Sequence, residues 1–193
     1  MKYLCLILIF SLSIFSLDAQ TSVGLKFGYS NFKFHEKCKE KTCSKHTGIQ
    51  GVNIGLIGRH QVSDKFNIKS ELFYTTKGSN PGKSFLNNFE NHLALPILLN
   101  YRLFKRLNIY AGPEMSYLLS LYGVDDFTFF KVNVKSPSIR RFDLGLSIGT
   151  SFQFAKKWEL DLRFTEGLRS NSSAFRIINR GFYISLHRYF GKK

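Results

Sequence analysis

The chain of 193 residues is long enough for one domain, and its 20 Phe and 9 Tyr make it 16% aromatic. Its mean hydropathy is slightly negative, which excludes a bundle of membrane helices but suits a transmembrane β-barrel, whose lipid-facing and lumen-facing residues alternate. The formal net charge of +15 indicates a nucleic acid or an anionic surface as partner.

A cleaved signal peptide is predicted over residues 1–19. Lys2 precedes an apolar stretch that runs from Leu4 to Leu17, and cleavage is expected after Ala19. A membrane-anchoring helix is the alternative, but the stretch is shorter than the roughly 20 apolar residues that span a bilayer. Export favours an anionic lipid leaflet over nucleic acid as the partner of the mature domain, residues 20–193.

Period-two alternation of apolar and polar residues predicts eight strands in the mature domain. In chain order they lie near 23–29, 52–56, 66–74, 93–103, 107–117, 142–154, 158–164 and 182–190. The sixth strand alternates most regularly, with Phe142 and Leu144 on one face and Asp143 and Gly145 on the other. Each strand approaches the 9–11 residues that a tilted membrane strand needs.

Two features depart from this pattern. Near Asn31 the apolar residues change parity, so that Phe32 and Phe34 fall on the polar face, which predicts a bulge or a strand that extends above the membrane. Pro96 and Pro113 lie within predicted strands, although proline lacks the N–H that a fully paired strand donates.

The connections between these strands alternate in length. Three are short, at 62–65, 105–106 and 155–157, and four are long, at about 34–47, 77–91, 122–139 and 169–180. Outer-membrane barrels place short turns in the periplasm and long loops outside. The fold class predicted is therefore an all-β, eight-stranded antiparallel up-and-down transmembrane barrel in the bacterial outer membrane.

The polar faces of the strands predict a charged lumen. The residues assigned to it are Lys69, Glu71, Arg102, Glu114, Asp143, Glu159, Asp161, Arg163 and His187. An eight-stranded barrel is narrow enough for side chains to fill it, so these charges are expected to pair with one another and with water. A soluble lipocalin-like barrel, with its apolar face inward, is the alternative. The many Gly and Ser residues on the polar face and the aromatic residues near the strand ends favour the membrane form.

Several segments carry a resemblance to a known family. They include Gly51–Gly55, Ser63–Phe66, Leu95–Leu99, Tyr110–Glu114 and Asp143–Gly145, and both prolines lie within them. On these segments the chain resembles the outer-membrane β-barrel domain proteins of Gram-negative bacteria, often called the porin family. The resemblance implies a compact eight-stranded barrel and no particular substrate. Such barrels usually end on an aromatic residue, whereas Gly191, Lys192 and Lys193 follow Phe190 here. We therefore expect the barrel-assembly machinery to recognise the last strand differently or to tolerate a short tail.

The first long connection contains two cysteines and two histidines: His35, Cys38, Cys43 and His46. Because the exported compartment is oxidising, a disulfide between Cys38 and Cys43 is expected. Free thiols are one alternative. A zinc site is another, but the spacing is unlike that of structural zinc motifs and the neighbouring lysines repel a cation. No metal and no cofactor are predicted.

Basic residues gather in the predicted outer loops. The candidate binding residues for an anionic surface or lipopolysaccharide are Lys37, Lys39, Lys41, Lys45, Arg140 and Arg141. Further basic residues are Lys131, Lys135, Arg169, Arg176 and Arg180. The alternative is a set of solvated loops, because charge runs are commonly just hydrated.

No nucleophile–base motif is present, so the protein is predicted not to be an enzyme. His92 with Ser84, or Ser170, Ser172 and Ser173, could form a nucleophile–base pair, but no sequence spacing singles them out.

The predicted function is structural or surface-binding through the basic outer loops. The alternatives are a narrow channel for small solutes and a lipid A-modifying enzyme. The expected partners are outer-membrane lipids, lipopolysaccharide and, during biogenesis, the barrel-assembly machinery. The protein is expected to be a monomer that binds no nucleic acid.

Overall fold

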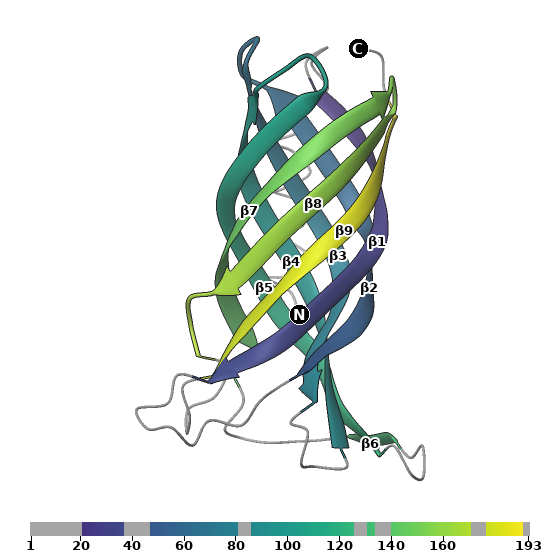
Figure 1. Ribbon diagram of the computed structural model, residues 1–193, viewed down its shortest axis with the longest axis vertical. Helices are drawn as coiled ribbons and strands as arrows, with labels where there is room; N and C mark the ends of the chain where they lie inside the picture. The colour runs from purple at the N-terminus through teal and green to yellow at the C-terminus, as the bar shows by residue number, and fades with distance from the viewer. Residues whose placement is uncertain are drawn as a thin grey trace, which may run out of the picture.

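A computed structural model describes residues 21–36, 47–80, 86–125, 131–133, 140–170 and 177–190, which form an antiparallel β-barrel (Figure 1). The strands are β1 (Thr21–Glu36), β2 (Thr47–Gln61), β3 (Phe66–Asn80), β4 (Leu86–Arg102), β5 (Leu107–Asp125), β6 (Lys131–Asn133), β7 (Phe142–Ala155), β8 (Trp158–Gly167) and β9 (Ile177–Phe190). The described residues contain no helix that is long and apolar enough to cross a membrane.

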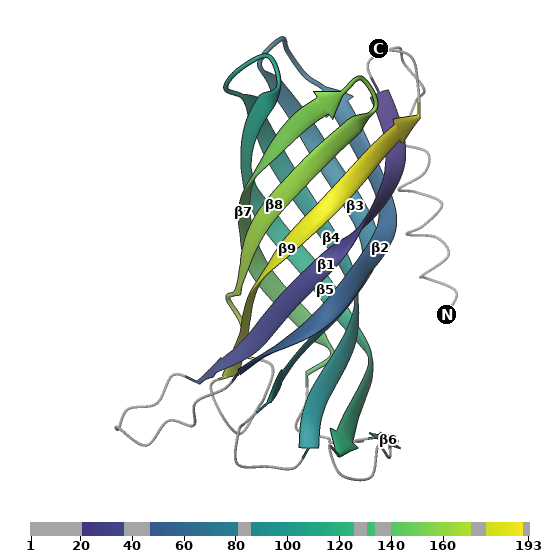
Figure 2. The ribbon, with the colours of Figure 1, turned by 45° about the vertical axis from the view of Figure 1, so that its right-hand side comes forward.

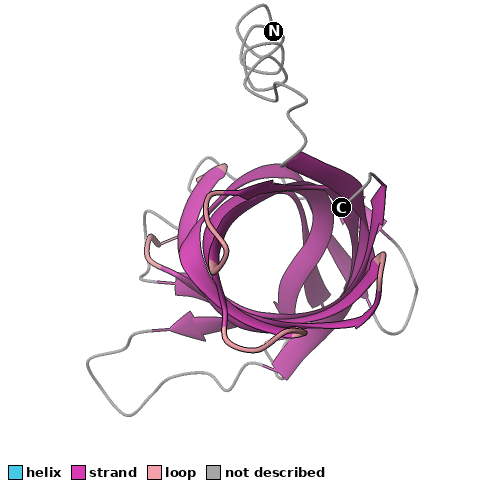
Figure 3. Ribbon diagram, turned by 90° about the horizontal axis from the view of Figure 1, so that it is seen from above, coloured by secondary structure: helices cyan, strands magenta, loops and turns pink. Residues whose placement is uncertain are grey.

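Eight of these strands close into the barrel wall, as the sequence predicts. Each pairs with its neighbours along the chain, and β1 pairs with β9 from Val23↔Phe190 to Glu36↔Ile177, which completes the ring (Figure 3). The short β6 pairs only with Tyr122–Val124 of β5 and stands outside the ring. Closure leaves no unpaired edge among the wall strands, which is the condition for a sheet to stand in hydrocarbon.

The connections follow the predicted alternation. The short turns lie at one end of the barrel, beside the start of β1 and the end of β9, and β6 lies at the opposite end (Figures 1 and 2). Several strands run further than the sequence pattern indicates: β3 continues to Asn80 and β4 begins at Leu86, within the predicted loop 77–91. The long-loop end of the barrel wall is therefore taller than expected.

Of the two explanations for the pattern change near Asn31, the bulge is absent and was wrong, whereas β1 does run on beyond it, to Glu36. The pairing of β1 with β9 continues through Asn31↔Phe182 and Phe32↔Gly181 without a shift. Phe32 points into the barrel because its even position keeps the inward parity of Lys26 and Ser30, both of which are buried. An aromatic ring inside the lumen, and not an irregular backbone, explains the change in hydrophobic pattern.

Both strand prolines are accommodated without a change of register. Pro96 lies within a gap of the β3–β4 ladder, between the pairs Ser70↔Ile97 and Phe73↔Ala94. The pairs on either side of the gap keep the same offset. The β4–β5 ladder skips similarly between Pro96↔Glu114 and Leu99↔Ala111, which leaves Pro113 unpaired on that side. Each proline therefore costs local hydrogen bonds but does not open the wall.

The outer surface of the wall is apolar along every wall strand. Leu56 and Ile148 each expose 59% of their surface, and large apolar residues of the other strands are similarly uncovered. A continuous apolar belt of this kind would be a liability in water but is the expected surface against lipid tails. With the exception of Arg102, the residues assigned to the lumen from the alternation face inward.

Glycine on one strand makes room for an inward aromatic ring on the next. Tyr110 lies across from Gly149, and a Cβ at Gly149 would come within 2.4 Å of the Tyr110 hydroxyl oxygen. Phe32 is paired in the same way with Gly181, where a Cβ would lie 2.5 Å from the ring. These close approaches let bulky rings lie flat against the wall of a narrow barrel.

Candidate functional site

The charged lumen is the most elaborate arrangement of polar side chains in the described structure. Of the eight charged residues assigned to it from the sequence, seven are buried inside the barrel: Lys69, Glu71, Glu114, Asp143, Glu159, Asp161 and Arg163. His187 is buried with them. Arg102 is exposed instead, because it is the last residue of β4 and lies beside the short turn, beyond the part of the lumen that encloses side chains.

Glu71 of β3 occupies the middle of this network. One carboxylate oxygen accepts a hydrogen bond from the Lys26 ammonium at 2.8 Å, and the other accepts one from the Arg163 guanidinium at 2.5 Å. Lys26 belongs to β1 and Arg163 to β8, so a single carboxylate joins three strands across the interior. Buried charges are stable only when they are paired and hydrogen-bonded, as they are here.

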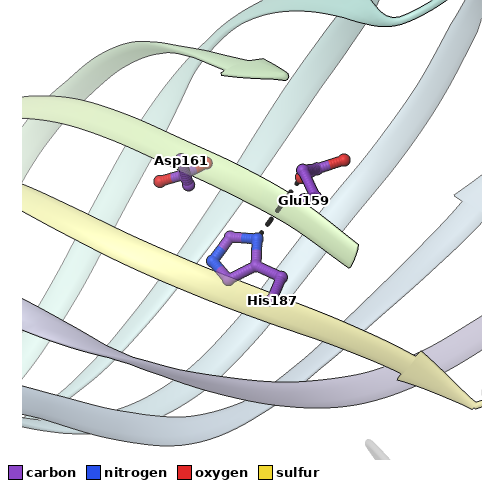
Figure 4. Close-up of side chains that lie close together, drawn as sticks. All are labelled: Glu159, Asp161 and His187. Carbon is purple, nitrogen blue, oxygen red and sulfur yellow. Dashed lines mark hydrogen bonds and ion pairs between the residues drawn. The ribbon is translucent and has the colours of Figure 1, made fainter. Parts of the chain in front are cut away.

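Toward the short turns lies a second group, which contains Glu159, Asp161 and His187 (Figure 4). A ligand atom of each lies within 4.8 Å of the others, which is close enough to hold a metal ion. The Lys69 ammonium, however, lies 2.8 Å from Asp161 and 3.6 Å from Glu159, and Arg59 donates a hydrogen bond to Glu159. These cations already neutralise the carboxylates, so the arrangement disfavours a metal ion.

Toward the long loops, Glu114 of β5 gathers a third group. It accepts hydrogen bonds from Lys77 at 3.3 Å, from the Ser147 hydroxyl at 3.0 Å and from the Tyr183 hydroxyl at 3.2 Å. These partners lie on β3, β7 and β9, so this group again bridges the barrel from side to side.

The outermost group joins Glu90, His92, Asp143 and Asn179. The Asn179 amide lies 3.3 Å from Glu90 and 3.4 Å from Asp143, and His92 lies 3.0 Å from Glu90. His92 is therefore engaged within the lumen and is not part of a described nucleophile–base pair. Ser84, Ser172 and Ser173, which were considered with it, lie outside the described residues.

Aromatic rings fill the space between these charged groups. The rings of Phe32, Phe73 and Tyr183 pack together at 4.9 Å and 5.5 Å between centroids, and the Lys26 ammonium lies 4.0 Å from the centre of the Phe73 ring. Lys26, Phe32 and Tyr183 have 0% exposed surface. In the middle of the barrel, side chains therefore occupy the lumen that the ribbon view alone would suggest is open (Figure 3).

Several members of this network were not predicted from the sequence, among them Lys26, Arg59, Lys77, Glu90 and Asn179. The parity of β1 could have identified Lys26, because it alternates with Leu25 and Phe27. Lys77, Glu90 and Asn179 fell in segments assigned to loops. Arg59 carried no signal of its own, because it follows the most regular part of its strand.

The candidate residues of the outer loops are only partly described. Lys37, Lys39, Lys41, Lys45, Cys38 and Cys43 lie outside the described residues, so the disulfide stays a prediction. Arg140 and Arg141 are exposed at the start of β7, where the Arg141 carbonyl accepts a hydrogen bond of 2.7 Å from the Leu118 N–H. This backbone contact fixes the two arginines against β5.

A family model described as "Outer membrane protein beta-barrel domain" matches residues 18–173. The chain belongs to this family. Its members' location in the outer membrane agrees with the lipid-facing belt, and the protein is an integral barrel of the bacterial outer membrane. No curated protein sequence matches the chain.

Solved barrels of the outer membrane share the fold. Neisserial surface protein A is 9% identical with a TM-score of 0.57, and the match covers 88% of this chain and 99% of that one. Ail, the attachment invasion locus protein of Yersinia pestis, is 12% identical with a TM-score of 0.53 and coverages of 89% and 99%. That Ail structure contains the heparin analogue sucrose octasulfate. At identities this low, the similarity between this chain and the two solved barrels shows a shared fold.

Proposed function

We propose that this outer-membrane barrel is a surface-binding protein whose long-loop end binds densely sulfated or phosphorylated saccharides, such as lipopolysaccharide. The observation that carries the proposal is the adjacent, exposed pair Arg140 and Arg141 at the start of β7. Lys33 and Arg169 are exposed toward the same end, and the segment between β1 and β2 adds four lysines in nine residues, Lys37 to Lys45. Clustered cations above an apolar wall favour an anionic polymer as the partner.

The filled lumen supports a binding role over the narrow-channel alternative. Buried ion pairs and aromatic rings cross the interior at several levels, and a solute path would have to separate them. The wall then acts as a support, and the exposed cations at its long-loop end are the residues that can meet a partner. The heparin analogue bound by Ail carries the same anionic chemistry, which we extend to this chain only as part of the proposal.

The test is a titration of the purified barrel in uncharged detergent with sucrose octasulfate and, separately, with lipopolysaccharide. We expect binding that weakens as salt is added, because exposed charges are screened. The double variant Arg140→Gln/Arg141→Gln should bind about fivefold more weakly, equal to about 1 kcal/mol. The matched control is Lys156→Gln/Lys157→Gln, which removes the same charge at the opposite end.

Unchanged affinity in the arginine variant, or an equal loss in the lysine control, would overturn the proposal. Salt-independent binding would also contradict it.

A further inference from the structure

A second basic surface lies at the short-turn end, which the proposed function does not use. Six exposed cations form what we call the turn collar: Lys65, Lys105, Arg106, Lys156, Lys157 and Arg188. Arg102 is exposed beside them. Among the described residues of the three short turns, Asp64 is the one carboxylate, while Glu159 is turned into the lumen. The collar therefore presents a strongly positive ring to the periplasmic side of the membrane.

Backbone hydrogen bonds hold this ring in place. The Lys65 carbonyl accepts a hydrogen bond of 2.8 Å from the Arg102 N–H. The Arg106 carbonyl accepts one of 2.8 Å from the Gln153 N–H, and the Lys157 carbonyl accepts one of 2.9 Å from the Tyr189 N–H. Each basic turn is thus tied to the strand beside it in the wall. The backbone that carries the cations is held at the rim, so little backbone order is lost when they meet a partner.

The level of Arg188 shows where the collar stands relative to the membrane. Its guanidinium lies on the outer face of the wall, 5.3 Å from the Trp158 ring and 5.6 Å from the Phe190 ring. Aromatic rings of this kind gather at the height of the lipid headgroups. An arginine among them places its charge where lipid phosphates lie.

Exposed apolar residues share the same rim. Phe104, in the turn between β4 and β5, exposes 66% of its surface and is followed directly by Lys105 and Arg106. A large ring beside two cations suits the boundary between headgroups and acyl chains better than open water. This feature favours a lipid over a soluble anionic protein or a cell-wall polymer as the occupant of the collar.

From these observations we propose that the turn collar binds the headgroups of anionic phospholipids in the periplasmic leaflet. The proposal is independent of saccharide binding at the opposite end. It gives the barrel a selective shell of anionic lipid around its short-turn rim.

The single tryptophan of the chain, Trp158, lies within the collar and serves as a local reporter. The purified protein is reconstituted in mixtures of phosphatidylglycerol and phosphatidylcholine in which one or the other carries brominated acyl chains. Because bromine quenches only nearby indole, the quenching gives the relative association of the two lipids at the collar. We expect phosphatidylglycerol to be preferred about fivefold, which corresponds to about 1 kcal/mol, the scale of one cation near an anionic surface.

Two matched variants locate the preference. Lys156→Gln/Lys157→Gln should clearly lower the ratio, because it removes two collar cations next to Trp158 in the chain. Arg140→Gln/Arg141→Gln, at the opposite end, should leave it unchanged. Raising the salt concentration should reduce the preference. Millimolar inorganic phosphate at constant ionic strength should not change it, because the lipid headgroup is held by its bilayer.

Three results would overturn the proposal. They are equal quenching by the two lipids, a preference that is undiminished in the lysine variant, and a preference lost in the arginine variant. Loss of the preference on adding millimolar phosphate would point to a site for free anions and would also contradict it.

Discussion

Glu71 meets three buried cations, with Lys26 at 2.8 Å, Arg163 at 2.5 Å and Lys69 at 4.0 Å. None of the four side chains has exposed surface. The Glu71 carboxylate therefore supplies negative charge to several buried cations that bulk water does not reach. Its removal should cost far more than the loss of one exposed ion pair.

We therefore expect Glu71→Gln to lower the free energy of unfolding by about 3 kcal/mol or more, since it leaves buried cations without their counter-charge. The measurement is a urea titration of the barrel in lipid vesicles. Glu166→Gln is the matched control, because Glu166 pairs with Arg180 in a partly exposed bridge of 2.5 Å. That variant should lose about 1 kcal/mol or less. Equal losses in the two variants would show that the buried network adds nothing special.

At the scale of single strands, β5 is the longest element, with 19 residues, and its far end carries the short β6. β6 pairs with Tyr122–Val124, beyond the last pairs that β5 forms with β7 at Tyr117↔Phe142. The hairpin is therefore an addition to the wall and not a part of its closure.

Replacing residues 126–139 with a short Gly–Ser linker should consequently leave the barrel intact. We expect the variant to stay in the outer-membrane fraction and to keep a gel mobility in mild detergent that changes on heating. A contrasting variant inserts one alanine between Gly149 and Thr150, which turns the remainder of β7 inside out. It should lose the heat-dependent mobility. Loss of the folded band in the linker variant would show that β6 belongs to the folded core.

The strands themselves could be predicted from the sequence, because lipid-facing apolar residues alternate with lumen-facing residues along each strand. Their ends could not, because beyond the bilayer the outward face no longer has to be apolar. Lys77 and Glu90 sit in such extensions, where the polar outer residues hide the alternation. Phe32 was misjudged for the opposite reason, since it is an apolar residue on the inward face.

The partners within the lumen were beyond sequence reasoning. That Lys69 and Asp161 both face inward follows from alternation, but their contact at 2.8 Å joins β3 to β8 across the barrel. Such contacts depend on the stagger of all the strands between them, and no local pattern encodes that stagger. The sequence thus predicts which charges enter the interior but not how they pair.

For the whole molecule, the packed interior predicts that the protein does not conduct ions. We expect no steady current across a planar bilayer that contains the wild-type barrel. Phe32→Ala/Phe73→Ala removes two of the rings that fill the centre and should introduce a measurable leak. Phe27→Ala/Phe164→Ala, which removes two exposed rings from the lipid-facing side, is the control and should stay silent. Steady conductance in the wild type would favour the channel alternative.

The seam between β1 and β9 joins the two ends of the chain through pairs as distant as Val23 and Phe190. The backbone N–H and C=O groups on the edge where β1 and β9 meet can be hydrogen-bonded only after both strands have been made and exported. Contacts so far apart in sequence form slowly, because a long segment must lose its freedom before they are made. Closure of this seam should therefore be the last step in the folding of the wall.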